Sequence, residues 1–429
     1  MDSTARVTYH RTPEPSATPW GTGEDTGRNP LSAQHAHLQE GARRGRRPRW
    51  PTTLEDFETE ARRVLSADDH GRDVLAYLFG TAGRGRTAAA NLAAFDDHTI
   101  ITNVLRRVDL RDHRITLFGT PMAAPLLLAP VGGLDLIEPR ADISVAEAAA
   151  HTGLTWIHSP AASVTPEEVN AQVPGGHRWF ELMLSADDTL NHSMIHRAQR
   201  TGHTVLVVNL DTPVIGWRSS LFDHGWPFDH GYGAATFRTD PIFAARLRDP
   251  EDPAEFGRQF AALFNDGSRT PNDLALVRSR WTGTLLVKGI LTARDAHLAT
   301  QAGADGIIVS NHGGRQQDRG VATLHALAHV IHGAHGVPVL LDGGIRSGAD
   351  MLIALALGAQ AVLIGLPYAL GLAVDGYDGV RHVLDCLLAD YDRTMAVAGY
   401  RSPSELGPAA LYSRPRTASL PTRPWPSTT

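Results

Sequence analysis

The sequence predicts an α/β protein, a (β/α)8 barrel of the TIM type with an N-terminal helical segment and a long loop after the fourth strand. From about residue 125, eight short apolar runs alternate with segments that are mostly long enough to form a helix. Polar residues and glycines follow most of these runs, as at the rim where barrel strands end. An open, doubly wound sheet has the same periodicity and remains the alternative. The runs are residues 126–129, 155–159, 179–183, 205–210, 285–288, 306–310, 337–341 and 361–364.

Composition and charge exclude several classes of function. Of the 429 residues, 42% are hydrophobic and 20% are charged, which is typical of a globular protein. The net charge of −6 gives no electrostatic reason to bind nucleic acid or an anionic membrane. A single cysteine, Cys386, excludes a disulfide framework and a cysteine-rich metal site. Since the chain has no run of 18 apolar residues and no signal-peptide core, we expect a cytoplasmic protein.

Changes in composition along the chain suggest its domain organisation. Residues 1–33 are rich in Pro, Gly, Thr and Ser, which predicts a disordered tail. We expect residues 34–99 to form helices that pack on the barrel, one of them starting at Thr53, where acidic residues follow a potential N-cap. The barrel is expected over residues 100–406, with a C-terminal tail over residues 407–429. The segment of residues 219–282 is too long to be one connecting helix. We expect it to be an insertion that serves as a lid or an oligomer contact.

The strongest chemical signal is the turn Ser-Asn-His-Gly-Gly-Arg-Gln at residues 310–316, directly after an apolar run. His312 can move a proton near neutral pH, and Arg315 can hold a carboxylate through two parallel hydrogen bonds. This pair suits an enzyme that removes a proton or hydride from the carbon next to a carboxylate. Asp211, at the end of the fourth run, can orient the imidazole and stabilise its protonated form. The alternative is that His312 only caps the turn.

Other strand ends predict an anionic ligand. Lys288 closes an apolar run, where a cation is costly unless it faces an anion or an electron-rich ring; a lysine that reaches solvent is the alternative. Residues 342–348, Asp-Gly-Gly-Ile-Arg-Ser-Gly, supply backbone N–H groups and the guanidinium of Arg346. Gly365 follows the eighth run, so the last two strand ends predict a phosphate site.

The chain resembles the FMN-dependent 2-hydroxy acid oxidases and dehydrogenases from about residue 38 to residue 406. The motifs that carry this resemblance are residues 209–213, 286–289, 310–316 and 341–348. Within the family, the chain is most similar to the L-lactate 2-monooxygenase branch, through residues 216–218, 239–243 and 395–401. The resemblance implies non-covalent FMN and oxidation of a 2-hydroxy acid to a 2-oxo acid with oxygen as electron acceptor. A monooxygenase would also decarboxylate its product. We further expect a homo-oligomer, either a tetramer or an octamer.

The resemblance also implies roles for individual residues. His312 corresponds to the catalytic base and Asp211 to its partner, and Lys288 corresponds to the cation beside the flavin ring. Three residues correspond to groups that contact the substrate carboxylate, and Met183 lies at a further substrate-binding position. The three carboxylate-binding residues are Arg315, Arg218 and Tyr77. The implied cofactor-binding residues are Pro130, Val131, Ser159, Glu181, Lys288, Ser310, Asp342, Gly344, Arg346 and Gly365.

Four positions depart from the family pattern. The family usually has Gln where this chain has Glu181, Tyr at Met183, a large aromatic residue at Ala161 and Arg at Leu366. An ionised Glu181 would oppose negative charge on reduced flavin, and Leu366 cannot bind phosphate through its side chain. Met183 and Ala161 would make the substrate pocket larger and more apolar. Two alternatives therefore stay open: an FMN oxidase for a larger or amine-bearing metabolite, and a flavin-binding scaffold with reduced catalysis.

Overall fold

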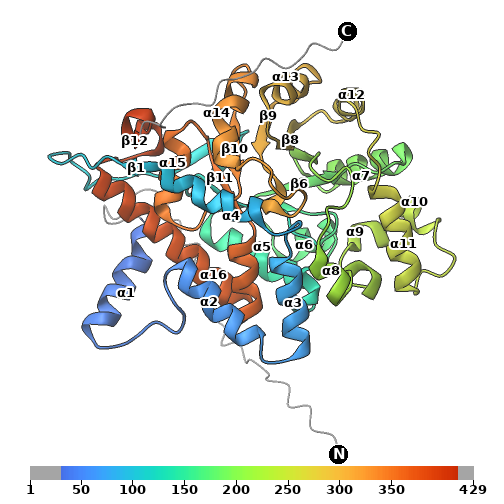
Figure 1. Ribbon diagram of the computed structural model, residues 1–429, viewed down its shortest axis with the longest axis horizontal. Coiled ribbons are helices and arrows are strands. Elements are labelled where there is room, and N and C mark those ends of the chain that lie inside the picture. Colours follow the sequence, from blue (N-terminus) through green and yellow to red (C-terminus); the bar gives the residue numbers. More distant parts are fainter. Residues whose placement is uncertain (1–29, 414–429) are drawn as a thin grey trace, which may run out of the picture.

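Eight parallel strands close into a barrel at the centre of the computed structural model, which describes residues 30–413 (Figure 1). Each strand pairs with the next, and β11 pairs in parallel with β4, which completes the ring. The predicted barrel is confirmed. The open-sheet alternative is wrong because in an open sheet β4 and β11 would not pair with each other. The strands are β4 (Leu126–Leu128), β5 (Thr155–His158), β6 (Arg178–Met183), β7 (Val205–Asn209), β8 (Thr284–Ile290), β9 (Gly306–Val309), β10 (Val339–Asp342) and β11 (Val362–Ile364).

A short hairpin closes the amino-terminal end of the barrel. It consists of β2 (Ile115–Leu117) and β3 (Thr120–Met122), whose apolar side chains pack with the residues inside the barrel. The indole nitrogen of Trp179 donates to Thr120 Oγ1 at 3.1 Å. A Cβ on Gly306, the first residue of β9, would lie 2.5 Å from the ring of Phe118. Since the hairpin fills this end, a ligand site can form only at the carboxyl-terminal end of the strands.

Helices surround the barrel and bury one face each against it. They are α5 (Ala141–Thr152), α6 (Pro166–Gln172), α7 (Asp188–Arg200), α12 (Pro271–Arg280), α13 (Ala293–Gln301), α14 (Thr323–Gly333), α15 (Gly348–Ala356) and α16 (Leu366–Ala398). The sequence predicted only residues 379–398 of α16. The helix instead begins directly after β11, with Pro367 in its first turn, a position that proline favours. A kink at Asp375 and Gly376 separates this first part from the predicted one.

Three of the N-terminal helices pack beside α16, namely α1 (Ala33–Arg43), α2 (Leu54–Leu65) and α3 (Asp69–Phe79). The fourth, α4 (Arg86–Ala93), packs against the 3-10 turn His312–Gly314. The expected N-cap is confirmed, because the hydroxyl of Thr53 accepts a hydrogen bond from the amide of Asp56. Helices α2, α3 and α16 lie side by side (Figure 1). Residues 30–33, which the sequence assigned to a disordered tail, form a 3-10 turn and the start of α1, whereas residues 1–29 lie outside the described part.

The end of the described chain is also more ordered than the sequence indicated. Strand β12 (Leu411–Ser413) pairs antiparallel with β1 (His98–Ile100). Of the predicted C-terminal tail, residues 408–413 form a 3-10 turn and β12, and residues 414–429 lie outside the described part. Two three-residue strands that are more than 300 positions apart carry no local signal of their pairing. The remaining 3-10 turns are Pro30–Ser32, Ala94–Asp97, Leu134–Leu136, Pro227–His230, His312–Gly314, Pro403–Glu405 and Pro408–Ala410.

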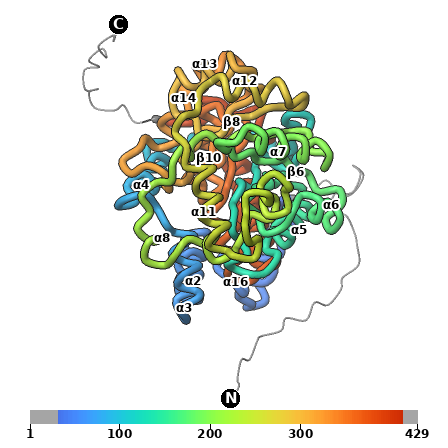
Figure 2. The backbone as a smooth tube through the Cα atoms, turned by 90° about the vertical axis from the view of Figure 1, so that its right-hand side faces the viewer, coloured from blue at the N-terminus to red at the C-terminus, as the bar shows by residue number. Residues whose placement is uncertain are grey.

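The insertion between β7 and α12 is helical and packs around its own aromatic core. It contains α8 (Ser219–His224), α9 (Ala235–Arg238), α10 (Pro241–Ala244) and α11 (Pro253–Phe264). These helices lie together at the right of Figure 1 and face the viewer in Figure 2. The amide of Ala234 donates to Ala161 O at 3.0 Å, and the amide of Gly233 donates to Asp135 Oδ2 at 2.8 Å. These bonds fix the insertion to the loops after β4 and β5.

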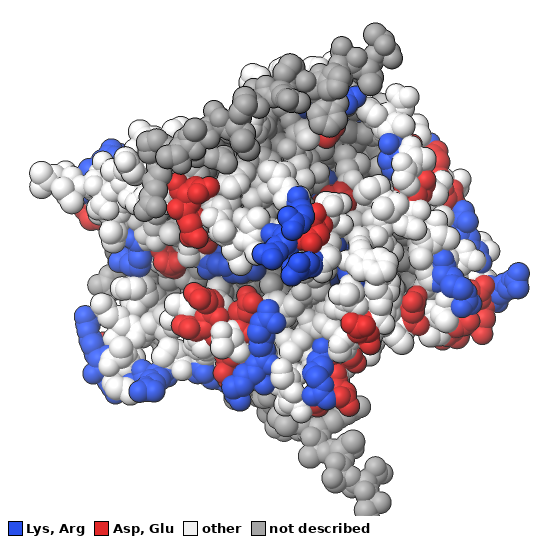
Figure 3. Space-filling model, viewed as in Figure 1, with Lys and Arg blue, Asp and Glu red and all other residues white. Residues whose placement is uncertain are grey.

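The surface carries charges of both signs. Acidic and basic side chains are interspersed over the face shown in Figure 3. Within residues 30–413, none of the helices is both long and apolar enough to cross a membrane.

Candidate functional site

The carboxyl-terminal ends of the strands surround a cavity of about 490 Å³, within the range of small-molecule and cofactor sites. Most of the predicted site residues line it: Tyr77, Pro130, Val131, Ser159, Glu181, Met183, Arg218, Lys288, His312, Arg315, Asp342, Gly344, Arg346 and Gly365. Asp211 and Ser310 lie behind the wall, where each bonds a residue that faces the cavity. Ser310 Oγ donates to Asp342 Oδ2 at 2.7 Å. The assignment of Ser310 to cofactor binding stays a prediction.

His312 is arranged as a base. Its Nδ1 lies 2.8 Å from Oδ1 of Asp211. Burial opposes ionisation of Asp211, but Lys288 and His312 hold the pKa of this carboxyl well below its usual range. An ionised Asp211 accepts a hydrogen bond from Nδ1–H, so Nε2 carries the free lone pair. Burial lowers the pKa of His312 although Asp211 opposes the shift, so the ring is neutral at neutral pH and can accept a proton. The ring bonds Asp211, and its role as a catalytic base instead of a capping or surface residue stays a prediction.

Lys288 is a buried cation between carboxylates. Its Nζ lies 3.3 Å from Asp211 Oδ2 and 3.5 Å from Asp342 Oδ2, and the residue is only 3% exposed. The alternative of a lysine that reaches solvent is therefore wrong. Burial alone would lower the pKa of Lys288, but Asp211, Asp342 and Glu181 raise it, so the ammonium stays charged. The cavity thus has a fixed positive charge in its wall.

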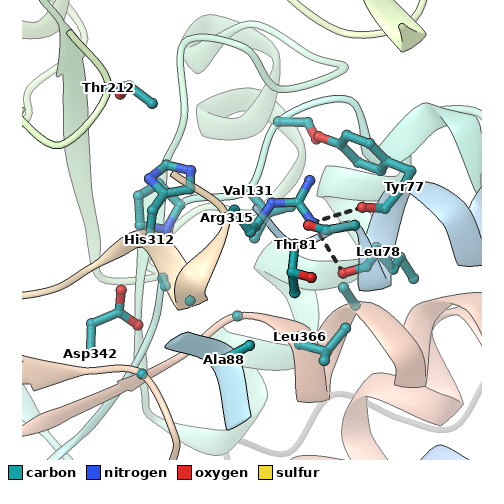
Figure 4. Close-up of a pocket in the computed structure, with 18 of the residues that line it drawn as sticks. Tyr77, Leu78, Thr81, Ala88, Val131, Thr212, His312, Arg315, Asp342 and Leu366 are labelled. Atoms are coloured by element: carbon teal, nitrogen blue, oxygen red, sulfur yellow. Dashed lines mark hydrogen bonds between the residues drawn. The ribbon is translucent and has the colours of Figure 1, made fainter. Parts of the chain in front are cut away.

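Two guanidinium groups face the same cavity. Arg315 uses Nη1 to donate to the backbone oxygen of Tyr77 at 2.8 Å, as Figure 4 shows, and to that of Gly80 at 2.7 Å. Arg218 donates through Nε to Arg315 O at 2.7 Å and through Nη2 to the side chain of Gln316. Within residues 30–413 neither arginine forms an ion pair with a carboxylate, and burial lowers the pKa of both. Two buried, unpaired cations are the arrangement that a bound carboxylate would stabilise.

Helices α3 and α4 hold the turn that carries His312 and Arg315. The side-chain amides of Asn91 and Asn311 exchange two hydrogen bonds of 2.8 Å each. A Cβ on Gly314, which has a φ of 78°, would lie 2.5 Å from the amide of Ala88. Sequence reasoning did not assign Asn91 a role, and a lone asparagine on a helix gives no local signal of one.

Tyr77 lines the cavity at the end of α3. Its hydroxyl donates to Gly132 O at 2.6 Å, and the guanidinium carbon of Arg315 lies 5.3 Å from its ring centre. While the hydroxyl keeps this bond, it can only accept a hydrogen bond from a ligand. Direct contact between Tyr77 and a substrate carboxylate stays a prediction.

Glu181 is a buried acid whose charge depends on pH near neutrality. Its Oε2 accepts a hydrogen bond of 2.8 Å from Ser159 Oγ. Burial raises the pKa of Glu181 to about 7, against the opposing effects of Lys288 and of the Ser159 hydrogen bond. The carboxyl is therefore close to half protonated at neutral pH, and its protonated form can donate a hydrogen bond, as the usual glutamine would.

The ends of β10 and β11 line the cavity with a glycine-rich turn, and its role as a phosphate site stays a prediction. Gly343 and Gly344 have φ values of 103° and 87°, and a Cβ on Gly344 would collide with the backbone of Asn91. Arg346 and Gly365 line the cavity at this end. His312 and Leu366 line the same cavity and lie apart from each other in Figure 4, so the cavity extends from His312 to the ends of β10 and β11. With Lys288 in its wall, this cavity fits a flavin mononucleotide.

Two groups of cavity residues were not predicted. The first is the aromatic set Trp226, Phe228, Phe260 and Phe264 from the insertion, and the second is Glu58 and Arg62 from α2. The sequence does contain a signal for the first group, since aromatic residues recur every four positions along α11. It contains none for the second group, because exposed helix faces are often charged.

Comparisons with known proteins agree with this geometry. The family described as FMN-dependent dehydrogenase matches residues 67–413. An FMN-dependent alpha-hydroxy acid dehydrogenase of Schizosaccharomyces pombe is 36% identical over 81% of this chain and 89% of its own. A solved (S)-mandelate dehydrogenase, described as a monotopic membrane protein, has a TM-score of 0.76 at 30% identity and covers 85% of this chain and 100% of its own. A mandelate oxidase solved with (S)-4-hydroxymandelic acid has a TM-score of 0.74 at 33% identity, covering 84% of this chain and 98% of its own.

Replacing Glu181 with Gln should change how stability depends on pH. An ordinary glutamate has a pKa of 4.5, whereas the pKa of Glu181 in the folded chain is about 7. Between these values the folded state holds a proton that the unfolded state has lost, so stability falls as pH rises through this window. We subtract the free energy of unfolding of wild type from that of Glu181→Gln at each pH. This difference should be up to about 2.5 kcal/mol larger at pH 8 than at pH 5.

Urea denaturation of the full chain without flavin, at both pH values, measures this difference. Glu251→Gln, at an exposed position, is the control and should show no comparable dependence. The same relative stability of Glu181→Gln at pH 5 and pH 8 would mean that Glu181 has an ordinary pKa.

Proposed function

Because this chain belongs to the FMN-dependent dehydrogenase family and is an FMN-dependent enzyme that oxidises 2-hydroxy acids, we propose that its substrates carry a bulky apolar or aromatic side chain and that oxygen accepts the electrons. The observation that carries the proposal is the aromatic wall of the cavity. Phe228 and Phe260 line it with ring centres 5.0 Å apart, and Trp226 lies 5.5 Å from Phe228. Met183 and Ala161 line the same cavity with side chains smaller than the usual aromatic residues.

An apolar wall selects for an apolar substrate. Each methylene buried there contributes about 0.8 kcal/mol to binding, so a phenyl group gains far more than the methyl group of lactate. The mandelate oxidase and dehydrogenase that resemble this chain act on aromatic 2-hydroxy acids by name, which supports the same class here. A short acid would leave water against the aromatic rings.

The polar residues supply the chemistry. Arg315 and Arg218 hold the carboxylate, which places the substrate hydroxyl and Cα toward His312. His312 Nε2 takes a proton from the substrate, and Asp211 stabilises the imidazolium that results. FMN, when bound, would supply the two-electron acceptor for this oxidation, with oxygen as the final acceptor. Lys288 would place a positive charge next to the group that becomes negative on reduction.

Release of the product decides between an oxidase and a monooxygenase. Oxygen that takes two electrons and two protons leaves as hydrogen peroxide. If the insertion retains the 2-oxo acid, peroxide can react with it to give carbon dioxide, water and an acid shorter by one carbon. The docking of the insertion on Ala161 O supports such retention. The amounts of peroxide and carbon dioxide formed per substrate distinguish the two outcomes.

We also propose that the protein acts in the cytoplasm as a homo-oligomer, a tetramer or an octamer. Val104, Leu105 and Leu110 are exposed apolar side chains on one connecting segment, as a subunit interface would use. The mass of the protein in solution, measured by light scattering, tests the assembly, and a monomer would contradict it.

His312→Asn should slow flavin reduction by roughly two to four orders of magnitude, the usual contribution of a general base. Binding of a carboxylic acid that cannot be oxidised should survive this change. Arg315→Lys should instead weaken that binding, because an ammonium group cannot make two parallel hydrogen bonds. Anaerobic stopped-flow absorbance gives the rate, and a flavin difference titration gives the binding. Equal reduction rates in wild type and His312→Asn would remove the assignment of the base.

Phe260→Ala should change the choice of substrate. The specificity constant for an aromatic 2-hydroxy acid should fall roughly tenfold to a hundredfold, from lost apolar contact, while that for lactate changes little. Met183→Tyr should narrow the same cavity. It should raise the specificity constant for small acids and lower that for large ones. The ratio of the two specificity constants is the measurement, since a general loss of folding affects both equally. A wild type that prefers lactate to every aromatic acid tested would refute the proposed substrate class.

A further inference from the structure

The phosphate end of the cavity lacks the side-chain cation that the family usually has after the last strand. Leu366 occupies that position, and an apolar side chain cannot donate a hydrogen bond to phosphate. A phosphate monoester carries a charge of about −1.5 to −2 at neutral pH. Two groups at this end of the cavity can bind such a charge. One is the guanidinium of Arg346, and the other is the N-terminus of α16, where Gly365 has no side chain to cap the first amides.

We propose that Arg62, on helix α2, supplies the missing cation and binds the phosphate of FMN. Arg62 lines the same cavity as Gly344, Arg346 and Leu366, although it is about 300 residues away in sequence. Helix α2 packs against the part of α16 beyond its kink, where Phe57 stacks on His382. The first part of α16 begins at Leu366 in the cavity wall, so both helices contribute to the cavity that Arg62 lines.

Local contacts hold the Arg62 side chain against the cavity wall. Its guanidinium carbon lies 3.3 Å from the ring centre of Phe79, which also lines the cavity. Its Nη2 donates to Oε1 of Glu58 at 3.0 Å. A guanidinium has five N–H donors, so this bond leaves donors for a ligand. Stacking on Phe79 also restricts the planar group, which lowers the entropy lost when it binds phosphate.

Glu58 interacts with both guanidiniums at this end of the cavity. Its carboxylate accepts a hydrogen bond from Arg62. Burial lowers the pKa of Arg346, and the charge of Glu58 opposes that shift. Glu58 is also a competitor for the phosphate, so its removal should favour FMN.

Binding of FMN and of riboflavin to the full chain freed of flavin separates the phosphate from the ring. Arg62→Gln should weaken FMN roughly tenfold to a hundredfold, the size of one charge-assisted hydrogen bond. Riboflavin, which lacks the phosphate, should bind as it does to wild type. Quenching of flavin fluorescence reports both affinities without turnover.

The neighbouring residue provides a matched control. Arg63 lies on the same helix and bonds Glu60 at 2.8 Å, but its side chain is 70% exposed and it does not line the cavity. Arg63→Gln removes the same charge and should leave both affinities unchanged. Glu58→Gln should bind FMN at least as tightly as wild type. Arg62→Gln combined with Leu366→Arg should recover most of the lost FMN affinity.

Three results would overturn the proposal. Unchanged FMN affinity in Arg62→Gln would show that Arg346 and α16 hold the phosphate alone. Equal weakening of FMN and riboflavin would show that Arg62 serves only to pack α2. If Arg62→Gln and Arg63→Gln weaken FMN binding equally, the effect comes from the loss of a distant charge and not from direct contact with the phosphate.

Discussion

The buried ammonium of Lys288 is the group on which the arrangement of the site depends. A cation this far from water is stable only beside anions, so Asp211 and Asp342 must approach it from the ends of β7 and β10. Each of these carboxylates then holds a second group: Asp211 orients His312, and Asp342 accepts from Ser310. One charge thereby links four consecutive barrel strands. Removing it would leave these two carboxylates without the cation that lies between them.

The barrel alone does not complete the site. The turn after β9 carries the base and a guanidinium, but α3 and α4 determine where this turn lies. Arg315 is held by the last carbonyls of α3, which carry the negative end of the helix dipole, and Asn311 is held by Asn91. The N-terminal helices are therefore part of the site. The insertion adds an apolar wall, so three separate regions of the chain enclose one cavity.

The departures from the family pattern have different consequences. Met183 and Ala161 leave room that the aromatic residues of the insertion line, which changes the shape of the pocket more than its chemistry. Glu181 changes the chemistry, because a buried acid with a pKa about 7 adds a proton-dependent charge beside Lys288. Leu366 removes a cation at the opposite end, where Arg62 lies within the same cavity. None of the four changes replaces the base or its partner.

The sequence by itself determined the barrel and the residues at its rim. The apolar runs that form the parallel strands are recognisable from the local sequence. Closure of the barrel brings the carboxyl ends of these strands together independently of the connecting loops. The N-cap of α2 was also predictable, since Thr53 and Asp56 are three positions apart. Only the tertiary structure decided which helix faces reach the cavity. Periodicity shows that a helix face is buried, but it does not show which other element that face packs against. Asn91, Arg62 and the pairing of β1 with β12 depend on such docking. The charge of Glu181 was decided in the same way, since burial sets its pKa.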